Sequence, residues 1–135
     1  MELRKLVAHA NLVSDEDFEF VQVIEFINDA IDKINIECGA KFPTIDSEFD
    51  TPEDEYTAIP DTWQRMLLVP FTAGRIKEND SSQFEYTDWY AQFDLNLDKF
   101  KSKYNIPEKY LETNLKTGRY EDNFLNNPYS PTRGW

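Results

Sequence analysis

Histidine and cysteine, which most often supply a catalytic base or nucleophile near neutral pH, each occur once in this chain of 135 residues. His9 falls in a short helical stretch near the N-terminus, where we expect a surface or packing role. Cys38 continues the apolar stripe of a longer helix, so we expect a core residue rather than a nucleophile. A single cysteine also excludes an internal disulfide. The residue chemistry therefore predicts that the chain is not an enzyme.

Carboxylates are densest in a proline-bounded segment, residues 40–60. Its acidic side chains are Asp46, Glu48, Asp50, Glu53, Asp54 and Glu55. A calcium-binding hand that began at Asp46 would need glycine at its sixth position and glutamate at its twelfth, where the chain has Thr51 and Thr57. A glycine-rich phosphate loop is not found either, since the chain has four glycines. We therefore expect no metal and no cofactor, and we interpret the segment as a long, solvated acidic loop.

An apolar stripe before this loop predicts a helix over residues 15–38. Ser14 followed by three acids is typical of a helix start, and Gly39 suits a left-handed cap at the other end. The stripe advances in steps of four and three residues through Phe20, Ile24, Ile27, Ile31, Ile34 and Cys38. A shorter helix is predicted over residues 2–10, and it must pack on something because isolated helices of this length are marginal.

Two further helices are predicted after the loop. Residues 61–77 form the first, and Pro70 inside it is expected to kink or open the helix. Residues 82–104 form the second, which starts with a capping box of Ser82 and Glu85. Its stripe, expected to face the stripe of residues 15–38, is Tyr86, Tyr90, Phe93, Leu97, Phe100 and Tyr104.

The predicted fold class is therefore all-α. Residues 1–104 are expected to form a small helical bundle, with a short N-terminal helix, three longer helices and the acidic loop. A short hairpin is expected inside that loop, around residues 42–45 and 56–59. Residues 105–135 are expected to form a separate, extended arm.

The arm carries apolar side chains without the spacing of a helix or the alternation of a strand. Prolines and asparagines interrupt it, yet a disordered tail would be poor in aromatic residues. We therefore predict a docking arm whose anchors are buried by a partner protein or a neighbouring subunit. The anchors are Tyr110, Leu111, Leu115, Tyr120, Phe124, Leu125, Tyr129 and Trp135.

The net charge of −12 lies entirely in the body, because the arm holds equal numbers of acidic and basic residues. Such a body lacks the basic footprint of a nucleic-acid reader, although it could surround DNA without gripping it. No apolar run approaches the roughly 18 residues of a membrane span, and no signal peptide is visible. A lone cysteine suits a reducing cytosol, so we expect a soluble, cytoplasmic protein.

Short motifs in a particular order add a family resemblance over residues 2–104. They are NLVS at 11–14, FINDAIDKIN at 26–35, GAKFP at 39–43, YTAIP at 56–60, WQRMLLVPF at 63–71, GRIKENDS at 74–81, WY at 89–90 and NL at 96–97. Their order and spacing resemble those of the head–tail connector, or adaptor, proteins of long-tailed bacteriophages, also called head completion proteins. Residues 105–135 resemble this family only in being a C-terminal arm of the same general type.

The resemblance implies a structural virion protein of the phage neck that is made in the host cytoplasm. Copies of such a protein form a ring, commonly of twelve subunits, below the portal protein. The ring extends the DNA channel, through which DNA passes without specific binding, and it docks the stopper or tail-completion protein. By the same analogy the arm would reach the portal or a neighbouring copy, and the acidic loop would face the lumen or the tail.

An acidic inhibitor that mimics DNA and blocks a nucleic-acid enzyme is the alternative function. The net charge favours it. The neutral, aromatic arm argues against it, because a mimic acts through its charged face. Binding of a mimic should weaken steeply with salt, whereas binding through aromatic anchors should weaken much less.

Overall fold

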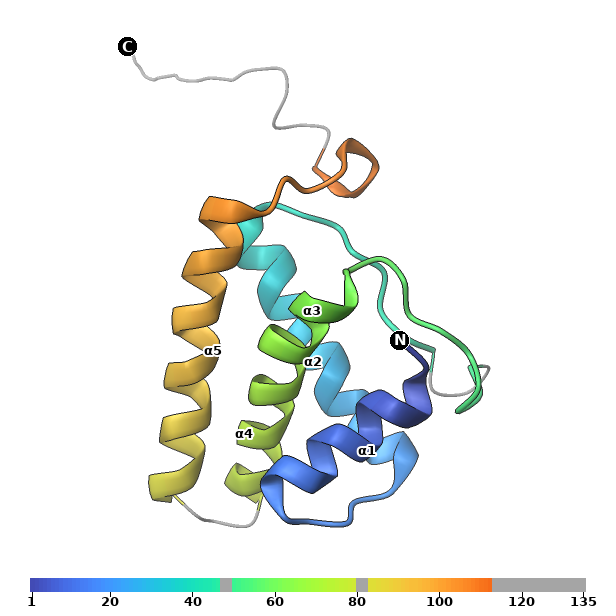
Figure 1. Ribbon diagram of the computed structural model, residues 1–135, viewed down its shortest axis with the longest axis vertical. Coiled ribbons are helices and arrows are strands. Elements are labelled where there is room, and N and C mark those ends of the chain that lie inside the picture. Colours follow the sequence, from blue (N-terminus) through green and yellow to red (C-terminus); the bar gives the residue numbers. More distant parts are fainter. Residues whose placement is uncertain (47–49, 80–82, 113–135) are drawn as a thin grey trace. The chain divides into compact units, whose positions relative to one another are not determined.

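Helices dominate the chain in the computed structural model, which describes residues 1–46, 50–79 and 83–112 (Figure 1). The elements in chain order are α1 (Leu3–Ser14), α2 (Phe20–Cys38), α3 (Asp61–Trp63), a π-helical segment (Gln64–Leu68), α4 (Val69–Asn79), α5 (Gln83–Lys103) and a 3₁₀ turn (Glu108–Tyr110). Within the described residues, irregular segments join these helices, and the only β pairing consists of isolated bridges. The predicted all-α fold class is confirmed.

The chain divides into two compact units. The first, the helical unit, comprises residues 1–34 and 42–105. The second, the C-terminal unit, groups residues 35–41, which include the last turn of α2, with the described residues 106–112. The predicted boundary after residue 104 stays a prediction. The sequence did not predict that residues 35–41 group with the C-terminal segment.

α4 is the central helix of the helical unit, because α5 and α1 both make most of their contacts with other helices through it. Figure 1 shows it between them. The ring of Phe71 on α4 lies 5.0 Å from that of Phe93 and 5.3 Å from that of Tyr90, both on α5. The expected direct pairing of the α2 and α5 stripes is thus not the main contact of α5. Both stripes still supply buried core residues, namely Ile24, Ile27, Ile31, Ile34, Phe93, Leu97 and Phe100.

A second group of rings packs around Phe100. Trp63 meets it edge-on at 5.1 Å between ring centroids, and Tyr104 stacks on it at 5.0 Å. Phe42, which follows α2, adds a tilted contact at 6.4 Å. Aromatic pairs in these geometries each contribute about 0.5–1.5 kcal/mol beyond the area that they bury. The bulky apolar composition therefore appears directly in the packing.

The prediction that Ser14 caps the second helix is wrong. α1 runs from Leu3 through Ser14 instead of ending near residue 10, and the buried Ser14 hydroxyl donates to the Ala10 carbonyl at 2.7 Å. Asp15 then ends α1 in a left-handed conformation, with φ at 58°. Ser14 satisfies its own helix, so it cannot cap the next one.

α2 begins at Phe20, several residues later than predicted. The cause is Asn11, whose Nδ2 donates to the Phe18 carbonyl at 3.0 Å while its Oδ1 accepts the Phe18 N–H at 3.1 Å. This reciprocal pair holds the backbone of residue 18 against α1. The acidic residues before Phe18 therefore lie in a connection rather than in a helical turn.

α3, the π-helical segment and α4 form one continuous helical run, as predicted for residues 61–77. The expected opening near Pro70 takes the form of the π-helical segment just before it, where the Val69 N–H donates to the Gln64 carbonyl five residues back. Pro70 has no N–H, so the Met66 carbonyl loses its α-helical donor. The Asn96 Nδ2 on α5 donates to that carbonyl at 2.8 Å instead.

The expected hairpin in the acidic loop is wrong. Side chains hold the two segments in place of a ladder of backbone bonds. Asn28 on α2 donates to the Ile45 carbonyl and accepts the Ile45 N–H, both at 2.8 Å. The Tyr56 hydroxyl donates to the Pro43 carbonyl at 2.7 Å. The backbone of Tyr56 pairs with Met1, whose carbonyl accepts the Tyr56 N–H at 3.0 Å.

Candidate functional site

The C-terminal unit shows how the segment after α5 is held. Gly39 ends α2 with φ at 62°, which confirms its predicted left-handed cap and turns the chain at residue 40. Lys41 then donates its N–H to the Tyr110 carbonyl at 2.7 Å, and Glu112 donates to the Gly39 carbonyl at 3.2 Å. Ala40 and Leu111 form an antiparallel bridge between these bonds. The start of the arm is therefore fixed by backbone pairing.

The first two predicted anchors, Tyr110 and Leu111, are both half-buried in this unit. The Lys109 ammonium lies 5.1 Å from the centre of the Tyr110 ring. The other anchors lie outside the described residues, and their burial by a partner stays a prediction. They are Leu115, Tyr120, Phe124, Leu125, Tyr129 and Trp135.

The acidic loop caps α1 through its backbone. Glu2 at the helix N-terminus makes no side-chain capping bond, so the first amides of α1 need other acceptors. Leu3 donates its N–H to the Asp54 carbonyl at 2.9 Å, and Arg4 donates to the Pro52 carbonyl at 2.8 Å. The loop thus completes the helical unit at this end. This structural role did not follow from its composition.

Two carboxylates of the loop bond to its own backbone, and most of its carboxylates are exposed. Asp50 and Asp54 bond locally, to the N–H groups of Asp46 at 3.0 Å and Thr51 at 2.6 Å. The side chains of Asp46, Glu53, Asp54 and Glu55 are exposed and that of Asp50 is half-buried, whereas Glu48 lies outside the described residues. That these carboxylates face a DNA channel or a tail stays a prediction.

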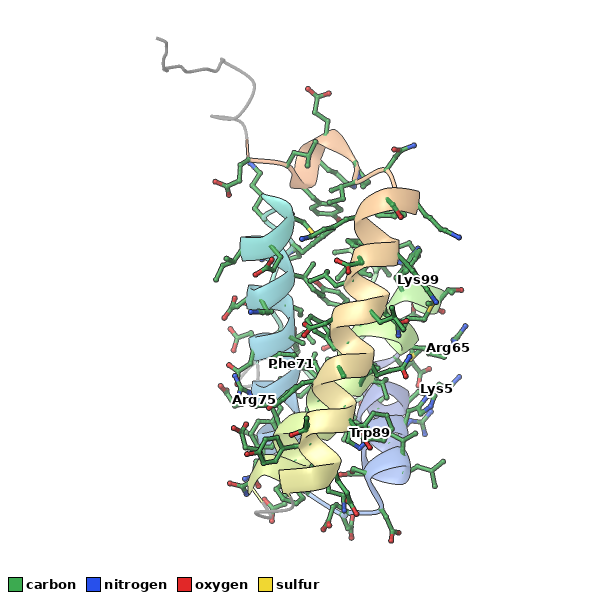
Figure 2. All side chains as sticks on the ribbon, turned by 90° about the vertical axis from the view of Figure 1, so that its left-hand side faces the viewer. Lys5, Arg65, Phe71, Arg75, Trp89 and Lys99 are labelled. Atoms are coloured by element: carbon green, nitrogen blue, oxygen red, sulfur yellow. The ribbon has the colours of Figure 1, made fainter. Side chains whose placement is uncertain are left out.

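A cluster around Arg75 joins three helices and was missed in the sequence. The Arg75 guanidinium on α4 stacks over the Phe71 ring at 5.0 Å and lies within 3.4 Å of the Asp29 carboxylate on α2 (Figure 2). It also pairs with Glu78 at 3.0 Å, and the Tyr90 hydroxyl on α5 donates to the same carboxylate at 2.7 Å. Burial raises the pKa of Tyr90, and the hydrogen bond from Tyr90 lowers the pKa of Glu78. The cluster fixes the relative positions of α2, α4 and α5.

Gly74 on α4 allows the Tyr90 ring of α5 to pack directly against the α4 backbone beside Arg75. A methyl group added at Gly74 would lie 2.5 Å from Cε1 and 2.8 Å from Cδ1 of Tyr90. The absence of a side chain in the middle of α4 therefore makes room for the Tyr90 ring. A glycine inside an apolar helix, one residue before an arginine, was the available sequence signal for this contact.

One hollow, with a volume of about 460 Å³, lies beside Trp89, between the end of α1 and α5. Its charges are already paired: the Lys77 ammonium lies 3.1 Å from the Glu16 carboxylate and 3.2 Å from that of Glu85. The hydrogen bond to Glu16 raises the pKa of Lys77. Neither histidine nor cysteine lines this hollow. Trp89 gives this recess an aromatic wall.

The two residues first considered for chemistry are not among those that line this hollow. His9 is half-buried on α1 and lines a second hollow of about 410 Å³ with Lys5 and Arg65. Cys38 is half-buried in the last turn of α2, which corrects the expectation of a core position: the helix ends there and leaves it partly open.

Two further features are absent from the described residues. Their histidine, cysteine and acidic side chains form no group of three able to hold a metal ion. None of their helices is long and apolar enough to cross a membrane. A scan against protein-family models and searches of curated proteins and of solved structures found no match to the chain.

Proposed function

We propose that this chain is a head–tail connector protein that forms a ring below the portal of a long-tailed bacteriophage. In this role it extends the DNA channel and docks the stopper or tail-completion protein. The proposal starts from the resemblance of residues 2–104 to the adaptor family. It assigns the chain a structural rather than an enzymatic role in the virion neck.

One observation carries the proposal: the motifs of the resemblance coincide with the specific contacts of the helical unit. Asn28, within the motif at 26–35, holds the backbone of Ile45 with two hydrogen bonds. Gly74 opens the motif at 74–81 and admits Tyr90. Trp63 opens the motif at 63–71 and packs edge-on against Phe100. A set of polar, small and aromatic residues that all serve one packing arrangement supports a shared fold with the adaptors, and hence a shared role.

The charge distribution suits a channel component. The body is strongly acidic, and the phosphate backbone of DNA is repelled rather than held by such a surface. The arm is neutral and aromatic, as expected for a segment that docks through apolar anchors. The same arm argues against the DNA-mimic alternative, in which binding would depend on charge.

Purified chain added to a portal ring tests this function directly. We expect a complex with the portal that survives a rise in salt, because aromatic anchors are screened far less than exposed charges. Electron microscopy of the complex should show an added ring beneath the portal. A chain that leaves the portal unbound and instead inhibits a nucleic-acid enzyme in a salt-sensitive manner would support the DNA-mimic alternative.

A further inference from the structure

The ring of Trp89 has no aromatic partner among the described residues. Trp63, by contrast, meets Phe100 edge-on at 5.1 Å between ring centroids. Trp89 is half-buried, yet within the described part of the chain it takes part in no ring pair and no cation stacks on it. Figure 2 shows Trp89 on the side of α5 next to α1, where it lines the hollow of about 460 Å³. We call this recess the Trp89 hollow.

The charged side chains that line the Trp89 hollow make it acidic. Asp15, Glu85 and Asp88 contribute carboxylates, and Lys77 contributes an ammonium group. Lys77 lies 3.1 Å from the Glu16 carboxylate and 3.2 Å from that of Glu85, so its charge is already compensated. Asp15 and Asp88 are exposed, and their carboxylates make no ion pair or hydrogen bond with the described residues. The hollow therefore offers two carboxylates to a cationic group.

A flat cation suits this combination of an aromatic ring and two carboxylates. Tryptophan is the aromatic residue whose face attracts cations most strongly. The guanidinium group of arginine stacks on such a ring while the N–H groups in its plane donate to carboxylates. Asp15 caps the end of α1 and Asp88 lies on α5, so the acceptors come from two elements. A lysine ammonium is a compact, strongly hydrated charge that gains less from the ring, so we expect arginine to be preferred.

The surface beside the hollow includes an exposed apolar side chain, which favours a protein segment over a free small cation. Asp88, Gln92 and Leu95 follow one another at spacings of four and three residues, so they lie along one line of α5. Asp88 and Gln92 line the hollow, and Leu95 beyond them is 55% exposed. Arginine anchors beside apolar contacts are typical of protein interfaces. A protein segment would use both features, whereas a free cation would use the hollow alone.

We infer that the Trp89 hollow binds an arginine side chain of a partner protein, whose neighbouring apolar residue contacts Leu95. The inference rests on the proposed function for its setting, since the partner would be another protein of the phage neck. The net charge of −12 favours the approach of such a basic segment. The helical unit would then supply a docking point of its own, in addition to the arm.

Nuclear magnetic resonance of the purified, isotope-labelled chain tests this binding without any neck protein. The chain has three tryptophans, and the indole N–H signal that is lost in Trp89→Phe is the signal of Trp89. The probe is a capped glycyl-arginyl-glycine peptide. We expect a saturable shift of the Trp89 signal, with a dissociation constant on the order of 1–10 mM because one side chain binds. The lysine counterpart should bind roughly two- to fivefold more weakly, and the neutral citrulline counterpart should leave the signal unchanged.

Two matched variants test the role of the carboxylates. Asp15→Asn/Asp88→Asn removes both charges, and asparagine tolerates the left-handed backbone at position 15. The arginine peptide should bind this variant roughly tenfold more weakly, because two exposed ion pairs are lost. Asp94→Asn/Asp98→Asn removes two exposed acids of α5 that do not line the hollow, and its affinity should stay within about twofold of the wild type. Circular dichroism and the midpoint of thermal unfolding establish that each variant is folded.

A Trp89 signal that does not move with the arginine peptide, or moves equally with the lysine peptide, would overturn the inference. A signal that moves with the concentration of the chain alone would assign the hollow to a second copy and would overturn it too. These results do not depend on a portal, so the proposed function would still be judged by its own test. Arginine-selective binding by a chain that leaves the portal unbound would uphold the inference and count against the connector role.

Discussion

The Asn96 amide on α5 donates a hydrogen bond of 2.8 Å to the Met66 carbonyl, the acceptor that Pro70 leaves without its helical donor. Asn96 is only 5% exposed, and Met66 is half-buried. A break in one helix is therefore repaired by a side chain from the next. This contact ties the π-helical segment and α4 to α5 at one point.

Asn96→Leu should lower the free energy of unfolding by about 0.5–1.5 kcal/mol, because it removes the hydrogen bond to the part-buried Met66 carbonyl. Pro70→Ala returns an N–H that can serve the same carbonyl. Asn96→Leu should therefore lower the free energy of unfolding less in the Pro70→Ala background than in the wild-type background. Urea unfolding followed by tryptophan fluorescence measures this coupling. Additive effects of the two substitutions would show that Asn96 does not act through Met66.

Gly74→Ala should destabilise the protein although alanine favours helices by about 1 kcal/mol over glycine. The new methyl group would lie 2.5 Å from the Tyr90 ring, and such overpacking costs about 1–3 kcal/mol. In a Tyr90→Ala background the same substitution should become neutral or stabilising. Thermal unfolding of the four chains decides the point: an equal effect in both backgrounds would rule out the contact with Tyr90 as the cause.

Glu78 should make stability depend on pH in the acidic range. Its pKa is lowered in the folded chain by the hydrogen bond from Tyr90 and by Arg75, from an ordinary value of 4.5. The stabilisation is therefore fully present above that value and disappears as the pH falls through the lower, folded pKa. Glu78→Gln should cost stability at neutral pH and progressively less below about pH 4.

The measurement is the difference in urea midpoint between Glu78→Gln and the wild type over a pH series. Glu53→Gln, on the exposed acidic loop, is the control for loss of a carboxylate elsewhere. The effect should be modest, because the Glu78 side chain is 45% exposed and solvent screens its charge. A difference that stays constant with pH would show that the charge of Glu78 does not stabilise the cluster.

Two truncated chains should show that residues 110–112 stabilise the C-terminal unit and that the rest of the arm does not affect the helical fold. A chain ending at Glu112 keeps the pairing of residues 39–41 with 110–112, so its helical circular-dichroism signal and unfolding midpoint should match those of the full chain. A chain ending at Lys109 loses the bonds of Lys41 and Glu112, each contributing about 0.5–1.5 kcal/mol.

Hydrogen exchange is the measurement that compares the chains ending at Glu112 and at Lys109. The shorter chain should exchange faster at residues 39–41 while residues of the helical unit stay protected. Loss of the helical signal in either truncation would contradict the prediction that the helical unit folds without the arm.

The sequence predicted the helices well because their apolar stripes are long and regular. The stripes from Phe20 to Cys38 and from Tyr86 to Tyr104 gave both long helices to within a few residues, apart from the start of α2. Gly39 gave its helix end because few other residues adopt a positive φ at low cost.

The errors arose where one side chain satisfies a backbone far from it in sequence. Asn11, Asn28 and Asn96 bond to Phe18, Ile45 and Met66, and these bonds decide where α2 starts, how the loop lies and how the helix opens before Pro70. Asparagine is common in turns and on surfaces, so its type alone does not reveal such a partner. The Arg75 cluster likewise depends on which helices become neighbours.

The most direct test of the connector role is a cryo-electron microscopy reconstruction of the neck of a particle assembled with this chain. The account predicts a ring of copies between portal and tail, with Tyr120, Phe124 and Trp135 buried against another polypeptide. Particles that lack the chain, or a structure in which those three side chains pack into the helical unit of their own copy, would contradict it.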